Sequence, residues 1–353
     1  MKKFFVASLL ATVFMTCGLQ LNAASWRVNN NTASGADFVD VNAAMGDERV
    51  TEGDTLYLDP GTYLTNTQYI TRRVTIVGSG YLHQESTVGP AIFRGGLDIK
   101  DNAAGTKIEG CVFTAFSYIN VSVDKVTFER NYFWGPRVSS SFSDYLVLHA
   151  NYIETDFEAI RGNNVNTTGW VITNNIIKSG LASNTWEGGV AVCSLDNATI
   201  QNNVIINHDI DDCCIYDVWS SVITNNIIIN ALNATNGHIS SPNNNNIITN
   251  NVTSSSSTDC DWPNFPNNTF LGSNDLTTVF ETTGIADRYY RLCEGSPAKG
   301  AGVGGIDCGA YAGDSYVPSG LPLYYPYFTN AVIPAVTTDG KLNIKLNIKT
   351  QNE

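Results

Sequence analysis

Short runs in which apolar and polar residues alternate recur along this chain, and most of them end in Asn. Two clear copies are Val171-Ile172-Thr173-Asn174-Asn175 and Val222-Ile223-Thr224-Asn225-Asn226. Seven copies have as their central apolar residue Ile108, Phe128, Leu148, Ile172, Ile200, Ile223 and Ile248. These centres are 20, 20, 24, 28, 23 and 25 residues apart. Because periods of roughly 20 to 50 residues mark stacked repeats, each copy predicts one coil of a β-helix.

An Asn occupies the same place in nearly every copy. We expect it at the bend between two strands, because Asn tolerates the left-handed backbone region. Stacked amide side chains, about 4.8 Å apart from coil to coil, would then hydrogen-bond as a ladder. The ladder predicted in this way contains Asn131, Asn151, Asn175, Asn203, Asn226 and Asn251, with Cys111 at the equivalent place in the first copy.

Both ends of the repeat region carry other patterns. Ser34 to Asp37 resembles a helix capping box, and Phe38, Val41 and Met45 follow at helical spacing. This predicts a short N-terminal helix that caps the first coil. Near the other end, residues 342–349 alternate between aliphatic and polar, which predicts an edge strand folded back along the solenoid. A sorting signal for secretion is the alternative.

The first residues have the features of an export leader. Lys2 and Lys3 precede an apolar run, and a small-residue cleavage site lies near Ala23 or Ala24. We therefore predict a signal peptide (1–23), a β-helix domain (24–315) and a C-terminal β extension (316–353). A secreted or periplasmic protein is expected, and no later stretch has the roughly 18 apolar residues of a membrane span.

Composition narrows the classes of partner. The formal net charge is -13, and only 15% of the residues are charged. Such an acidic chain would repel nucleic acid and anionic lipid, so we expect neither as a partner. We also expect the protein to be a monomer. Seven cysteines follow the leader, and Cys293 with Cys308 is the preferred disulfide pair.

Two motifs and the Asn-Asn coils carry a family resemblance. The motifs are Gly53-Asp54-x-Leu-x-Leu-x-Pro-Gly-x-Tyr63 and Val74-Thr-Ile-x-Gly78. Over residues 25–315 the chain resembles the right-handed parallel β-helix superfamily of pectate lyases, and Tyr290 to Tyr311 is similar to the closing coil of secreted β-helix proteins of Bacteroidetes-like bacteria. The resemblance implies an all-β fold of about nine coils, with a polysaccharide groove on the first sheet and its entering loops.

A second aliphatic column, preceding each Asn phrase, predicts the strands of that first sheet. It contains Ile99, Ile119, Val138, Ile160, Val192, Ile215 and Ile239. Strand side chains alternate between faces, so the flanking residues are predicted to point outward in two rows. One row is Asp98, Tyr118, Arg137, Cys214 and His238, and the other is Lys100, Asn120, Ser139, Arg161, Cys193, Tyr216 and Ser240.

Candidate chemistry gathers in the loops that enter this sheet. The candidate catalytic residues are His208, Asp211, Asp212, Arg161 and His238, and the candidate substrate-binding residues are Trp186, Tyr216, Trp219, Tyr118 and Glu187. Asp209, Asp211 and Asp212 form a candidate Ca²⁺ site, because calcium prefers oxygen ligands. Asp211-Asp212-Cys213 resembles the Gly-Asp-Asp-Cys of polygalacturonases, although Ile210 replaces the Gly.

Two functions remain open. The first is cleavage of an acidic polysaccharide, either by Ca²⁺-assisted β-elimination with Arg161, His208 or His238 as base, or by hydrolysis with two carboxylates. The second is a non-catalytic surface or periplasmic protein that binds a glycan or another protein. An enzyme needs its carboxylates, base and groove close together, whereas a binder needs only aromatic and polar side chains along the sheet.

Overall fold

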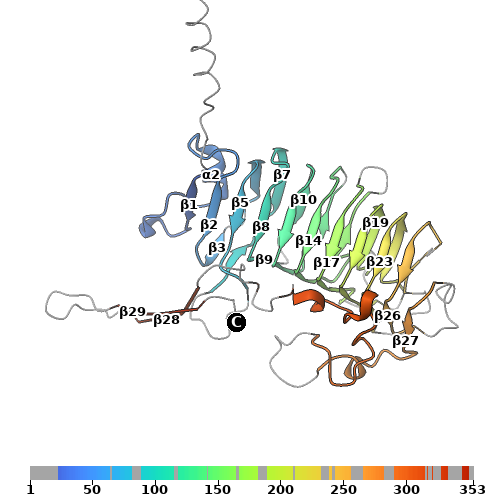
Figure 1. Cartoon of the computed structure of the whole chain (residues 1–353). Helices are drawn as coiled ribbons and strands as arrows, with labels where there is room; N and C mark the ends of the chain where they lie inside the picture. Colours follow the sequence, from blue (N-terminus) through green and yellow to red (C-terminus); the bar gives the residue numbers. More distant parts are fainter. Residues whose placement is uncertain are drawn as a thin grey trace, which may run out of the picture.

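The chain winds through three parallel sheets (Figure 1). The computed structural model describes residues 23–63, 66–81, 89–114, 118–140, 142–163, 167–181, 189–209, 211–231, 238–240, 243–255, 265–281, 290–314, 316, 320, 327–332 and 344–349. Along most of the chain, successive strands join the three sheets in turn, so each turn of the chain adds one strand to each sheet. This is the right-handed parallel β-helix that the repeats and the resemblance predicted, and the prediction is confirmed.

The strands are short and stack in register. Sheet A contains β1 (Ser25–Val28), β2 (Thr55–Leu58), β5 (Thr75–Val77), β8 (Lys107–Glu109), β11 (Thr127–Glu129), β14 (Val147–His149), β17 (Val171–Thr173), β20 (Thr199–Gln201), β23 (Val222–Thr224) and β25 (Ile247–Thr249). Sheet B contains β3 (Gly61–Tyr63), β6 (Ala91–Phe93), β9 (Cys111–Phe113), β12 (Tyr132–Trp134), β15 (Tyr152–Glu154), β18 (Ile176–Ser179), β21 (Val204–Asn207), β24 (Ile227–Asn230), β26 (Val252–Thr253) and β27 (Thr269–Phe270). Sheet C contains β4 (Gln68–Arg72), β7 (Leu97–Asn102), β10 (Ile119–Val121), β13 (Val138–Ser139), β16 (Ile160–Arg161), β19 (Val192–Asp196) and β22 (Ile215–Trp219).

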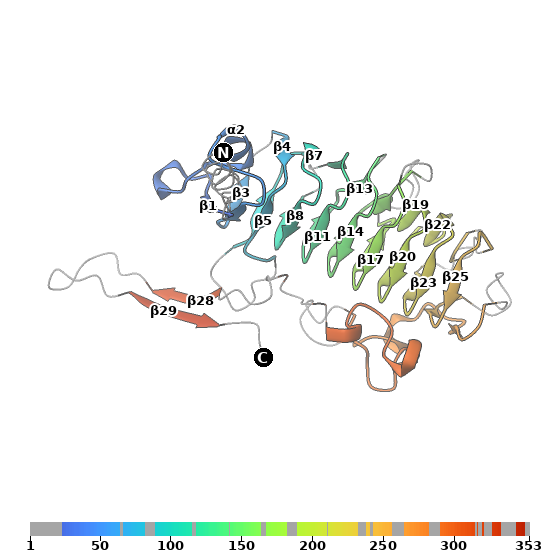
Figure 2. The ribbon, with the colours of Figure 1, turned by 45° about the horizontal axis from the view of Figure 1, so that its top comes forward.

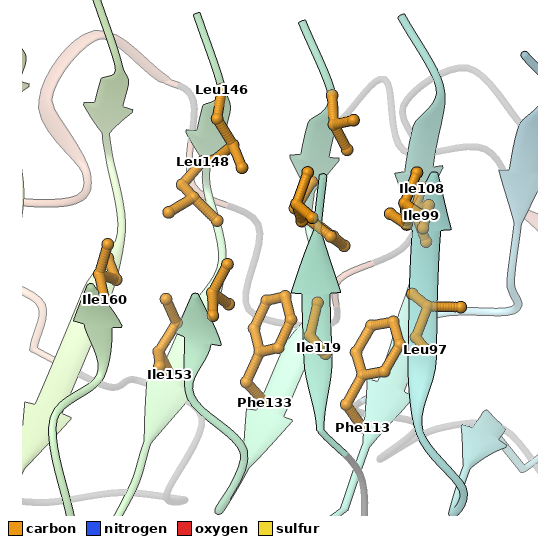
Figure 3. Close-up of a cluster of buried hydrophobic side chains, with 14 of the residues drawn as sticks. Leu97, Ile99, Ile108, Phe113, Ile119, Phe133, Leu146, Leu148, Ile153 and Ile160 are labelled. Atoms are coloured by element: carbon orange, nitrogen blue, oxygen red, sulfur yellow. The ribbon is translucent and has the colours of Figure 1, made fainter. Parts of the chain in front are cut away.

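The central apolar residue of each repeat points into the space that the three sheets enclose. Residues that bury their side chains there, and are labelled in Figure 3, include Ile108 and Leu148 of sheet A, Phe113, Phe133 and Ile153 of sheet B, and Leu97, Ile119 and Ile160 of sheet C. Phe113 and Phe133 stack with ring centroids 5.0 Å apart. Each coil therefore buries its apolar residues against the next coil, which stabilises the solenoid as a whole.

Amide side chains hydrogen-bond along the turn between sheets A and B. The Nδ2 atom of each Asn donates to the Oδ1 atom of the next, from Asn131 through Asn151, Asn175, Asn203, Asn226 and Asn251 to Asn268. Our explanation for these Asn residues was wrong, because the left-handed residue of each turn is the one before, such as Ala150 (φ 55°) or Asn174 (φ 56°). The role of the Asn that follows it is to form side-chain hydrogen bonds with the neighbouring coils.

A short helix lies beside the first coils. Helix α2 (Val41–Gly46) is capped by Asp40, whose side chain accepts a hydrogen bond from the backbone N–H of Ala43. It buries Val41 and Met45 and packs against β4. The Ser34 box does not start this helix, because Ser34 ends a separate 3₁₀ turn, η1 (Thr32–Ser34). No helix in the described part of the chain is long and apolar enough to cross a membrane.

The segment after the last coil strand runs back over the outer face of sheet B. This strap, residues 276–281 and 290–314, contains η3 (Leu276–Thr278), η5 (Val303–Gly305) and η6 (Ala312–Asp314). Its Ala298, Cys308 and Ala310 pack in a second apolar cluster with sheet B residues. The amide of Asn174 donates to the carbonyls of Ala310 and Ala312 and so anchors it. Residues expected as a closing coil thus form an external cover.

The C-terminal strands pair only with each other in the described structure. β28 (Tyr327–Val332) and β29 (Lys345–Lys349) form an antiparallel two-stranded sheet. It lies apart from the coils in Figures 1 and 2. The alternating pattern therefore predicted a strand correctly, but its expected pairing along the solenoid is wrong.

Cys293 and Cys308 are both free thiols, so the predicted disulfide is wrong. Each thiol has a backbone acceptor instead: Cys308 Sγ lies 3.2 Å from the carbonyl oxygen of Asn250, and Cys293 Sγ lies 3.5 Å from that of Thr278. Cys308 therefore packs against a coil, whereas Cys293 packs against another part of the strap, and the two thiols do not meet.

Candidate functional site

The outer face of sheet C presents one continuous row of side chains. Strand pairing aligns Tyr69, Asp98, Asn120, Ser139, Arg161, Cys193 and Tyr216. The predicted column was out of register at its start, because Leu97 rather than Ile99 pairs with Ile119. Asp98 consequently lies beside Asn120, whose amide donates to it over 3.0 Å.

The other predicted row does not face outward along its whole length. Cys214 and His238 are buried, and Cys214 Sγ lies 3.5 Å from the carbonyl oxygen of Ile229 in sheet B. Cys214 lies in the bend just before β22, which begins at Ile215, and there its thiol turns toward the backbone of sheet B and away from the surface. Tyr118 and Arg137, by contrast, reach the surface.

Two arginines from neighbouring coils share one carboxylate on this face. Arg137 Nη1 lies 2.9 Å from Glu158 Oε2, and Arg161 Nη1 lies 2.8 Å from the same oxygen. We call these two residues the arginine pair. Both of its guanidinium groups are partly exposed. Burial and the Glu158 charge raise the pKa of Cys193, which keeps this neighbouring thiol neutral.

Three aromatic side chains are exposed on the same face. Tyr118, Tyr216 and Trp219 are 53%, 49% and 46% exposed. The indole N–H of Trp219 donates to Asp217 over 2.8 Å, and the Tyr118 ring lies so close to Gly96 that a Cβ there would be 2.3 Å away. These contacts hold two of the rings in place. Trp186 and Glu187, the other predicted substrate-binding residues, lie outside the described residues.

The two candidate histidines contact other residues than the arginine pair does. His208 follows β21, at the end of a sheet B strand, and burial followed by the charge of Lys178 lowers its pKa. Its Nε2 atom is buried, with no hydrogen-bond partner among the described residues. His238 places Nε2 2.6 Å from Ser254 Oγ. The structure thus gives His208, His238 and Arg161 three separate sets of neighbours.

The acidic loop is held by hydrogen bonds to the backbone. Asp209 Oδ1 accepts from the N–H of Asp211 over 2.9 Å, and Asp212 Oδ2 accepts from the N–H of Gly189 over 2.7 Å. The amide of Asn207 donates to the carbonyl of Asp212. Within the described ranges, no three His, Cys, Asp or Glu side chains are placed to hold a metal ion. Asp209 and Asp212 thus accept hydrogen bonds from the backbone in this structure, and the Ca²⁺ site expected at this loop stays a prediction.

Sequence reasoning placed Arg137 and Arg161 in different rows and did not predict that the two arginines share Glu158. The connection depends on strand register, since Val138 of β13 pairs with Ile160 of β16 and thereby brings the arginines to adjacent coils. The available signal was that Arg137 comes just before inward-facing Val138, and Arg161 just after inward-facing Ile160.

Comparisons with known proteins add little to these observations. No family model and no curated protein matches the chain. Among solved structures, it is similar to the A-module of the mannuronan C-5 epimerase AlgE4 of Azotobacter vinelandii, with 14% identity, over 62% of this chain and 83% of that one, at a TM-score of 0.27. The fold assignment rests on the three sheets of the chain itself.

Proposed function

We propose that this protein binds an acidic polysaccharide along the outer face of sheet C. The observation that supports the proposal is the arginine pair, flanked along the coil axis by exposed aromatic rings. Tyr118 precedes β10 and Tyr216 lies on β22, four strands further along sheet C. At about 4.8 Å per strand, this face extends roughly 19 Å between them, which suits an extended chain better than a single sugar.

The chemistry of the arginine pair favours a carboxylate ligand. Guanidinium groups bind carboxylates through two parallel N–H donors, and both guanidinium groups of the arginine pair are partly exposed. Surface ion pairs are weak, of about 0 to 1 kcal/mol, so a sugar carboxylate can compete for the exposed guanidinium of Arg161. Aromatic faces provide apolar contact for the sugar rings.

Cleavage of the same polysaccharide is the second candidate, and His208 favours it. Its lowered pKa keeps the imidazole neutral at neutral pH, the form that a general base needs. Against this, its Nε2 atom is buried, and its neighbours differ from those of Arg161.

Affinity electrophoresis of the purified protein in gels that contain uronic-acid polysaccharides, with neutral polysaccharides as the control, tests the proposal. Unsaturated products and new reducing ends are followed in parallel, each with added Ca²⁺ and with a chelator. We expect retardation by acidic polymers only, without release of product. Product formation would establish cleavage, and equal mobility in all gels would overturn the proposed binding.

A further inference from the structure

Asp54 is a fully buried carboxylate, and the hydrogen-bond donors around it are uncharged. It is 0% exposed and accepts hydrogen bonds from the N–H of Ala24 over 2.7 Å, the indole of Trp26 over 2.8 Å and the N–H of Thr51 over 2.8 Å. Among the described residues, no ion pair joins it to a cation. Burial opposes the ionisation of Asp54, but these hydrogen bonds outweigh burial and lower its pKa, so the carboxylate is negatively charged in the fold.

Ala24 lies where the sequence predicts that the mature chain begins. Its carbonyl accepts from the N–H of Thr55 over 2.9 Å, and β1 starts at the next residue, Ser25. Ala23, on its other side, is exposed. The leader predicted from the sequence ends at Ala23, so its removal would turn the amide nitrogen that contacts Asp54 into an α-amino group.

We propose that the chain is hydrolysed between Ala23 and Ala24, and that the new α-ammonium group of Ala24 forms an ion pair with Asp54. An export-linked peptidase adds water across the peptide bond, Ala23 departs with the new carboxylate, and the amine of Ala24 takes up a proton. The positive charge then forms 2.7 Å from Asp54 Oδ1, if the nitrogen keeps its position. Processing would thereby supply the missing counter-charge and fasten the first strand.

The nearby charges already have partners of their own. Arg49 lies over the Trp26 ring at 5.3 Å and pairs with Asp47, and Arg73 pairs with Glu52. Among the described residues, neither arginine forms an ion pair with Asp54. The α-ammonium group is therefore the cation best placed to neutralise it, and charge-assisted hydrogen bonds of this kind are about twice as strong as neutral ones.

The ion pair has a defined pH dependence. An α-amino group ordinarily has a pKa of about 7.7 to 8.0, and a neighbouring carboxylate raises it in the folded state. Its stabilisation is then fully present below about pH 7.7 and is lost as the pH rises through the raised pKa. A chain that begins at Ala23 has the same net charge, but its α-amino group is on an exposed residue. Its stability should therefore not fall in this pH range.

Two proteins that differ only in their first residue, Ala24 or Ala23, provide the test. We expect the Ala24 form to melt about 3 °C higher at pH 7 and the difference to disappear at alkaline pH. Asp54→Asn should remove the difference at every pH; if that variant does not fold, the pH comparison of the two parent proteins decides. Mass spectrometry of the exported full-length protein should find Ala24 first. Equal melting of the two forms at all pH values, or an exported chain that begins elsewhere, would overturn the proposal.

Discussion

Asn151 and Asn175, 24 residues apart in sequence, are joined by two hydrogen bonds in the interior of the turn. The Nδ2 atom of Asn151 donates to Oδ1 of Asn175 over 3.0 Å, and the backbone N–H of Asn151 donates to the same oxygen over 2.8 Å. Both side chains are fully buried. One amide oxygen therefore binds the backbone and the side chain of the preceding coil together, which keeps the coils in register.

Replacing Asn175 by Ala should lower the free energy of unfolding by about 3 kcal/mol, because buried donors and acceptors on both neighbouring coils lose their partner. Asn175 also donates to the carbonyl of Leu148 and to Asn203. Urea denaturation measures the change. Asn120→Ala, at an exposed position, is the control and should change stability by less than about 0.5 kcal/mol. Equal losses of unfolding free energy in the two variants would show that the buried amide chain stabilises the fold no more than an exposed Asn does.

Replacing alanine by glycine should have opposite effects on stability at Ala150 and at Ala198. Ala150 is left-handed (φ 55°), a conformation that costs an L-residue about 1 to 2 kcal/mol and glycine almost nothing. After allowance for the lost methyl contact, Ala150→Gly should stabilise the protein by about 0.5 kcal/mol. Ala198 is equally buried but does not have a positive φ, so Ala198→Gly should destabilise it by about 1 kcal/mol. Melting curves of the two variants give the signs, and a loss in both would contradict the argument.

Sequence periodicity was sufficient to predict the stacked coils, because stacking buries the central apolar residue of every repeat in one shared core. It did not place the left-handed residue: Asn-Asn pairs such as Asn174-Asn175 leave either Asn free to take that role. The first-sheet register also failed at Ile99, since Leu97 and Ile99 both point inward and sequence alone does not say which pairs with Ile119.

The candidate site was harder to predict than the coils. Proximity of Arg137, Glu158 and Arg161 depends on exact strand pairing and on the course of a loop, neither of which has a sequence period. The strap was missed for a similar reason. Its contact with sheet B joins segments far apart in the chain, as between Asn174 and Ala310, and no repeat marks such a contact.

Two glycines of the strap should respond differently to alanine. A Cβ on Gly309 would lie 2.8 Å from Ile227 Cδ1, whereas one on Gly313 would meet nothing within 4 Å. Both have positive φ, so both pay a similar backbone cost. Gly309→Ala should therefore cost about 2 kcal/mol more than Gly313→Ala, because it also overpacks the contact with sheet B. Thermal unfolding and the rate of proteolysis in the strap measure this, and identical behaviour would argue against a tightly packed strap.

Thiol labelling should separate Cys293 from the other described cysteines. Burial, followed by the Asp307 charge, raises the pKa of Cys308 to about 12, and burial raises that of Cys214 as well. Because the thiolate is the reactive form, iodoacetamide at pH 8 should modify partly exposed Cys293 in the native protein and leave Cys308 and Cys214 intact until it is denatured. Peptide mass spectrometry reads the result. A Cys293–Cys308 disulfide peptide would contradict the described packing.

The most direct test of polysaccharide binding on sheet C compares matched substitutions on and off this face. Arg161 and Arg73 side chains are both 49% exposed and ion-paired, and Trp219 and Trp134 are 46% and 55% exposed, but only Arg161 and Trp219 lie on the proposed surface. Calorimetry with an acidic polysaccharide that retards the wild type should give at least a tenfold higher Kd, about 1.4 kcal/mol, for Arg161→Gln and for Trp219→Ala, with Arg73→Gln and Trp134→Ala unchanged. If all four variants bind as tightly as the wild type, the outer face of sheet C is not the binding site.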